Sequence, residues 1–176
     1  MKNVAFAQGI YEQSATALEE LDTIRVLNDG RTYAYSLAGA SALAAGKITQ
    51  SAAPSANANK ETLAADAAIG ATSLSVTFGG AVTADFYKGG YIWANDDAGE
   101  ATMYRVKGHP AGTTAVIVDL YEPVRVAMTA GATTVSVIQN RQSLVIVCPT
   151  TITAPFAGVP NIAVTAGYYF WNQVKG

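Results

Sequence analysis

The second half of the chain alternates short apolar runs with glycine-containing turns, the pattern of an antiparallel β protein. In three segments a glycine opens a turn, threonine follows, and apolar residues then dominate or alternate with period two: Gly70–Val76, Gly112–Val118 and Gly131–Val137. The runs GYIWA, ATMYRVK, SLVIVC and AVTAGYYFWNQV are also rich in β-branched or aromatic residues. We therefore expect about eight to ten short strands in a mainly β fold. An antiparallel β-sandwich, a jelly roll and a small β-barrel all fit this pattern.

The first half carries a hairpin signal and two helical signals. Asn28-Asp29-Gly30 lies between IRVL and RTYAYS and predicts a β-hairpin, because these turn residues accept positive φ at little cost. The run SATALEELDTI predicts a short helix capped by Ser14. The run LAGASALAAGKI predicts another, ending at Gly46. One or two short helices should thus accompany the strands.

The chain is expected to consist of an arm, a connecting region and a β domain. Thr49–Asn59 contains no charge and no large apolar residue, which is typical of a linker. Residues 1–30 contain two basic and five acidic residues, a net charge of −3 (2 − 5). We expect residues 1–24 to form an extended N-terminal arm, residues 25–59 the hairpin, a short helix and the linker, and residues 60–176 the β domain.

Composition excludes several classes of partner. Half of the residues are hydrophobic and only 14% are charged, so part of the surface should be covered by a partner or by further copies. A net charge of −2 argues against a nucleic-acid-binding protein. No apolar segment is long enough to cross a membrane, and no signal peptide is recognisable. The single cysteine permits no intrachain disulfide, which fits synthesis in the cytoplasm.

Residues with catalytic or metal-binding chemistry are few. The only histidine, His109, lies in the turn-like run KGHPAG and is expected to be an exposed loop residue. Cys148 ends an apolar run and is expected to be a small buried side chain. The acidic run Asn95–Glu100 lacks calcium-loop spacing and is expected to be a hairpin turn, with a bound cation and a hydrolase using Asp96 and Glu100 as the alternatives. We therefore expect no enzyme, no cofactor and no metal.

The aromatic run near the C-terminus should be divided between two faces of a strand. Tyr168 and Phe170 point to one side and Tyr169 and Trp171 to the other. We expect one pair to lie in the core and the other at a subunit or partner interface, with a carbohydrate-binding platform as the alternative.

The order of these motifs resembles that of the capsid decoration, or cement, proteins that stabilise the heads of tailed bacteriophages. The resemblance covers about residues 25–176 and is carried by NDGRTYAYSLAGASALAAGKITQ, GATSLSV, GGYIWANDDAGEATMYRVKG and GVPNIAVTAGYYFWNQVKG. It implies a structural virion protein, made in the host cytoplasm, that binds between major capsid subunits on the outer surface of the icosahedral capsid. It also implies a homotrimer in preference to a dimer, and no nucleic-acid or membrane partner.

Apolar arm residues and aromatic residues are the candidate contacts with the capsid or a sister subunit. They are Phe6, Ile10, Tyr11, Leu18, Leu21, Tyr33, Tyr35, Tyr169 and Trp171. Whether the arm meets the capsid or another copy stays open. The alternative function is a head-fibre or tail-fibre adhesin, or a carbohydrate-binding module.

Overall fold

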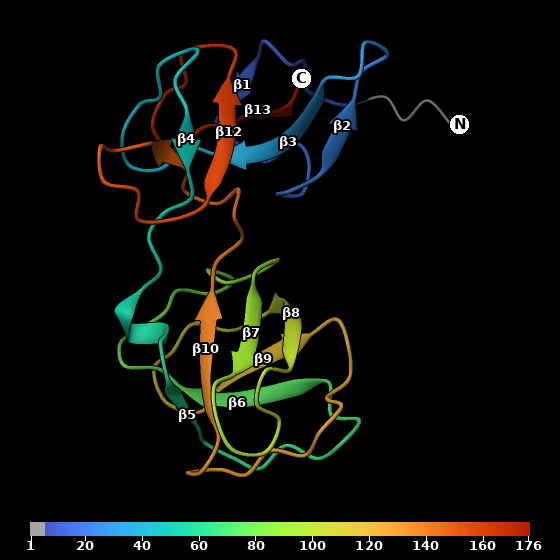
Figure 1. Cartoon of the computed structure of the whole chain (residues 1–176), viewed down its shortest axis with the longest axis vertical. Coiled ribbons are helices and arrows are strands. Elements are labelled where there is room, and N and C mark those ends of the chain that lie inside the picture. Colours follow the sequence, from blue (N-terminus) through green and yellow to red (C-terminus); the bar gives the residue numbers. More distant parts are fainter. Residues whose placement is uncertain (1–5) are drawn as a thin grey trace. The chain divides into compact units, whose positions relative to one another are not determined.

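The chain is mainly β and forms two compact units, as the computed structural model, which describes residues 6–176, shows (Figure 1). The residues up to Ala53 and Arg141–Gly176 form one unit, here called the terminal unit. Pro54–Asn140 form the other, here called the barrel unit. This division differs from the expected one, because the chain returns to the terminal unit after residue 140 and splits the region expected to be one β domain.

The terminal unit contains a seven-stranded sheet in which β13 is central. Its order is β11-β4-β12-β13-β3-β2, and β1 also pairs with β13. The longest pairing joins β13 to β3, from Tyr169 opposite Leu37 to Lys175 opposite Thr32. The strands are β1 (Gln13–Ser14), β2 (Ile24–Val26), β3 (Thr32–Leu37), β4 (Thr49–Gln50), β11 (Ile146–Val147), β12 (Phe156–Pro160) and β13 (Tyr169–Lys175).

The barrel unit is a closed six-stranded antiparallel barrel in the order β10-β5-β6-β9-β8-β7. Along β8, Tyr104 and Val106 are buried in the core while Met103, Arg105 and Lys107 are exposed, the alternation that a half-buried strand requires. The three glycine-initiated segments become β6, β9 and β10, so those predictions are confirmed. The strands are β5 (Glu61–Leu63), β6 (Ser73–Thr77), β7 (Tyr91–Ala94), β8 (Met103–Gly108), β9 (Val116–Leu120) and β10 (Thr134–Ile138).

Each unit contains two four-residue turns, and all four turns share the same sequence pattern. Each begins with an apolar or small residue and ends three residues later at a glycine with positive φ: residues 43–46, 67–70, 128–131 and 164–167. The first residues of these turns form paired bridges, Leu43 with Val164 in the terminal unit and Ala67 with Met128 in the barrel unit. A glycine is favoured at the fourth position because other residues rarely adopt this left-handed conformation.

Both predicted α-helices are wrong, while the predicted hairpin is confirmed. Ser14 belongs to β1, and the chain after it forms turns rather than a helix. The alanine-rich run around Gly46 forms the end of β3 and one of the four turns, because pairing with distant strands outweighs its helix propensity. The only helix among residues 6–176 is the 3₁₀ turn η1 (Ala56–Ala58). The hairpin joins β2 to β3, with Gly30 at φ 88°.

Within the described part of the chain, the structure contains no helix that is long and apolar enough to cross a membrane.

Candidate binding groove

The N-terminal arm lies against an aromatic cluster of the terminal unit. Tyr33, Tyr35 and Trp171 form this cluster and are at most 1% exposed. Phe6 meets the Trp171 ring edge-on, with centroids 5.2 Å apart. The Arg25 guanidinium lies over both rings, 4.9 Å from the centroid of Phe6 and 5.7 Å from that of Trp171. Residues 6–22 are therefore part of the folded unit rather than a separate extended arm.

Gln8 is the main polar link between the arm and the sheet. Its side-chain amide donates to the carbonyls of Glu12 (2.7 Å) and Tyr169 (3.1 Å) and accepts from the Tyr35 hydroxyl (2.7 Å). Its backbone carbonyl accepts from Trp171 Nε1 at 2.9 Å. Burial raises the pKa of Tyr35, which favours the protonated hydroxyl that donates to Gln8.

Burial removes several of the predicted interface residues from contact with a partner. The predicted alternation along β13 is confirmed, because Phe170 packs with Tyr168 in one cluster and Trp171 with Tyr169 in another. The expectation that one pair forms a subunit interface is wrong for Trp171, because the chain's own arm covers its ring. Tyr33 and Tyr35 are also fully buried, so neither can contact the capsid or a sister subunit.

The remaining predicted contacts keep some exposed surface. Tyr11 is 62% exposed and Leu18 is 45% exposed. The other four are half-buried: Phe6, Ile10, Leu21 and Tyr169.

His109 is a structural residue of the barrel unit, so the prediction of an exposed histidine is wrong. It is 5% exposed, and its Nε2 accepts from the backbone N–H of Tyr87 at 3.1 Å. Its Nδ1 lies 2.9 Å from the carbonyl of Pro110, so the neutral ring with the proton on Nδ1 satisfies both contacts. The backbone N–H of Tyr87 and the carbonyl of Pro110 thus hold the buried ring in place, a role that the composition of the turn does not reveal.

The acidic turn at Asn95–Glu100 also has a structural role. Asp96 accepts from the backbone N–H of Thr134 at 2.7 Å and from its hydroxyl at 2.8 Å. These hydrogen bonds lower the pKa of Asp96 below its usual value. In residues 6–176, no group of three or more His, Cys, Asp or Glu side chains is placed to hold a metal ion.

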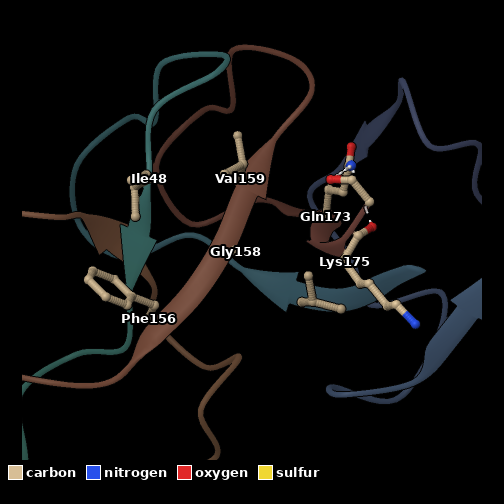
Figure 2. A pocket seen from close by; sticks show the side chains of 8 residues that line it. Ile48, Phe156, Gly158, Val159, Gln173 and Lys175 are labelled. Atoms are coloured by element: carbon tan, nitrogen blue, oxygen red, sulfur yellow. Dashed lines mark hydrogen bonds between the residues drawn. The ribbon is translucent and has the colours of Figure 1, made fainter. Parts of the chain in front are cut away.

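An apolar groove of the terminal unit lies along β12, between the residues just before β4, the end of β11 and the end of β13, and we call it the β12 groove. Ile48 and Phe156, each 54% exposed, line both of its hollows, which measure about 430 and 520 Å³. Figure 2 shows Ile48 and Phe156 close together, with Val159 on β12 beyond them. Ile152, 58% exposed, lines the larger hollow. Sequence patterns missed this groove, because isolated apolar residues at strand ends do not indicate which of them stay uncovered.

The rim of the β12 groove is positive. Lys175 lines one hollow and Lys47 the other, and the lining of neither hollow contains an acidic side chain. Cys148 lines the larger hollow and is partly exposed, whereas the sequence predicted a buried residue. The groove therefore offers apolar contact area to a partner whose own rim is neutral or acidic.

No protein-family model, curated protein or solved structure matches the chain.

Proposed function

We propose that this protein is a structural virion protein of a tailed bacteriophage that decorates and stabilises the outer capsid surface by binding between major capsid subunits. The observation that carries the proposal is the β12 groove, an exposed apolar surface on a chain with only 14% charged residues. Exposed apolar patches rimmed by polar residues mark protein interaction sites. The motif order that resembles decoration proteins supplies the identity of the partner.

The groove suits a permanent contact with a large assembly. Ile48, Ile152 and Phe156 are each more than half exposed, so a partner would remove substantial apolar area from water. The lysines at the rim would meet acidic groups of the capsid subunit and orient the contact.

Stabilisation would follow from binding one state of the shell. A protein that binds the expanded capsid and not its precursor stabilises the expanded state by its binding free energy. Many copies act on one shell, and a homotrimer would join several contacts into one avid attachment. This proposed function needs no chemical step, and therefore neither catalysis nor a cofactor.

Retention on capsids tests this proposal. Expanded capsids that lack the protein are mixed with the full chain and recovered by sedimentation. Phe156→Ser should weaken binding by about tenfold, because roughly half of a phenylalanine side chain contributes about 1–1.5 kcal/mol when it is buried. Ile69→Ser is the matched control, since Ile69 is 70% exposed but lies in the barrel unit. Equal retention of both variants, or no retention of the unmodified chain, would contradict the proposal.

The alternative function is a head-fibre or tail-fibre adhesin that binds glycans. The C-terminal aromatic residues do not favour it, because Phe170 and Trp171 are buried. A pocket beside Trp93 in the barrel unit does favour it, since a half-buried aromatic ring next to neutral polar groups suits a sugar.

A further inference from the structure

We propose that the barrel unit binds a neutral sugar ring in a pocket between η1 and the outer face of β7 and β10. This site is separate from the β12 groove and goes beyond capsid attachment. The pocket measures about 350 Å³, within the usual size of small-ligand sites. Its principal lining residues are Pro54, Ala56, Asn59, Trp93, Ser136 and Ile138.

The aromatic wall of the pocket is set by the strand alternation of β7. Ile92 and Ala94 point into the barrel and are buried, so Trp93 between them faces outward and stays half-buried. Trp93 lies opposite Ser136 of β10. An outward indole offers its electron-rich face to the C–H groups on the apolar side of a sugar ring.

A second ring extends this wall. Tyr91 is on the same face, two residues before Trp93, and is 40% exposed. Side chains two positions apart on a strand are separated by about 7 Å. The two rings therefore offer consecutive contacts to an oligosaccharide rather than to a single sugar.

The polar groups beside Trp93 leave an acceptor for a ligand hydroxyl. The Ser136 hydroxyl lies 3.0 Å from Oδ1 of both Asn59 and Asn95 and accepts from the backbone N–H of Lys60. A hydroxyl has one proton, so it satisfies only one of the two amide oxygens. When the Ser136 proton goes to Asn95, the Oδ1 of Asn59, which lines the pocket, is left to accept from a sugar hydroxyl.

Charge and topology select the class of ligand. None of the side chains that line the pocket is ionisable, so charge complementarity favours a neutral molecule over an anionic or cationic one. Both β7 and β10 are paired on each side within the closed barrel, so a peptide cannot bind there by adding a strand. A ligand that brings an apolar face and its own hydroxyl groups fits these conditions.

Calorimetry with maltohexaose, cellohexaose and chitohexaose tests the site on the full chain. At least one of these probes should bind with a Kd in the millimolar range or tighter. Trp93→Ala should weaken that binding by about tenfold or more, because it removes the stacking surface. Ile117→Ala is the matched control, because Ile117 is 44% exposed on β9 of the same barrel but does not line the pocket.

Fluorescence gives an independent readout because the chain has two tryptophans, Trp93 and Trp171. In a Trp171→Phe variant, the emission of Trp93 should shift on addition of the oligosaccharide that calorimetry identifies. The sugar site is overturned if none of the three probes binds, or if Trp93→Ala binds as tightly as the unmodified chain. It is also overturned if a proline-rich peptide, and no oligosaccharide, binds at Trp93. These outcomes leave capsid retention unaffected, since retention depends on Phe156.

Discussion

Replacing Gln8 by alanine should destabilise the terminal unit, because this side chain is the main polar link between the arm and the sheet. Gln8 is 2% exposed, and its side chain makes three hydrogen bonds, to Glu12, Tyr35 and Tyr169. A buried hydrogen bond contributes about 1 kcal/mol net, so Gln8→Ala should lower the free energy of unfolding by about 3 kcal/mol. For a chain of this length, this corresponds to a Tm lower by about 6–12 °C.

Urea unfolding followed by fluorescence measures this effect. A Trp93→Phe background leaves Trp171 as the reporter, and Trp171 lies under the arm. Gln13→Ala is the control, because Gln13 is exposed and its side chain accepts one hydrogen bond, from Thr165. This control should cost no more than about 1 kcal/mol.

A double-mutant cycle with Tyr35→Phe isolates the contact between Gln8 and the tyrosine hydroxyl. The effects of the two changes on the free energy of unfolding should be coupled by about 0.5 kcal/mol or more, because each change alone leaves the other buried polar group without this hydrogen bond. If Gln8→Ala changes the free energy of unfolding by less than about 0.5 kcal/mol, the hydrogen bonds of the Gln8 side chain do not stabilise the arm against the sheet and this role of Gln8 is wrong.

Three further changes probe the two units. His109→Ala should destabilise the barrel unit by about 2–3 kcal/mol, measured by urea unfolding, because it leaves the buried N–H of Tyr87 without an acceptor and opens a cavity. Gly158→Ala should lower the Tm, seen by calorimetry, because Gly158 has φ 151° and an added Cβ would lie 2.6 Å from the carbonyl of Gln173. Asp96 has a lowered pKa in the folded state, so its carboxylate stabilises the fold above the usual value of 3.8, and this contribution is lost as the pH falls through the folded pKa. The difference in unfolding free energy between Asp96→Ala and the unmodified chain should therefore narrow below about pH 3.8, and a constant difference would contradict this role.

Local patterns predicted the barrel strands β6, β8 and β9 well, because buried and more exposed residues alternate along each of them. The three glycine-initiated segments form β6, β9 and β10, and the hairpin at Gly30 joins β2 to β3, as the sequence predicts. The mainly β class follows from the same alternation, whereas the closed barrel is one of three architectures that it allows.

Long-range pairing is what the sequence did not reveal. The alanine-rich run before Gly46 has good helix formers, yet Leu43 bonds to Val164, more than a hundred residues away. The same limit hid the division into two units, because strands from both ends of the chain build one sheet. It also hid the burial of Trp171, since an aromatic strand looks the same whether an arm or a partner covers it.

The central claim is that the β12 groove contacts the capsid, and protection of Cys148 from alkylation on capsids tests it most directly. Cys148 is the only cysteine of the chain and lines the β12 groove, so the rate of its alkylation by a maleimide reports whether the groove is covered. If the protein decorates capsids through this groove, it should be retained on expanded capsids and Cys148 should react much more slowly there than in buffer. A chain that is not retained, or one that is retained while Cys148 reacts at its free rate, would contradict the account.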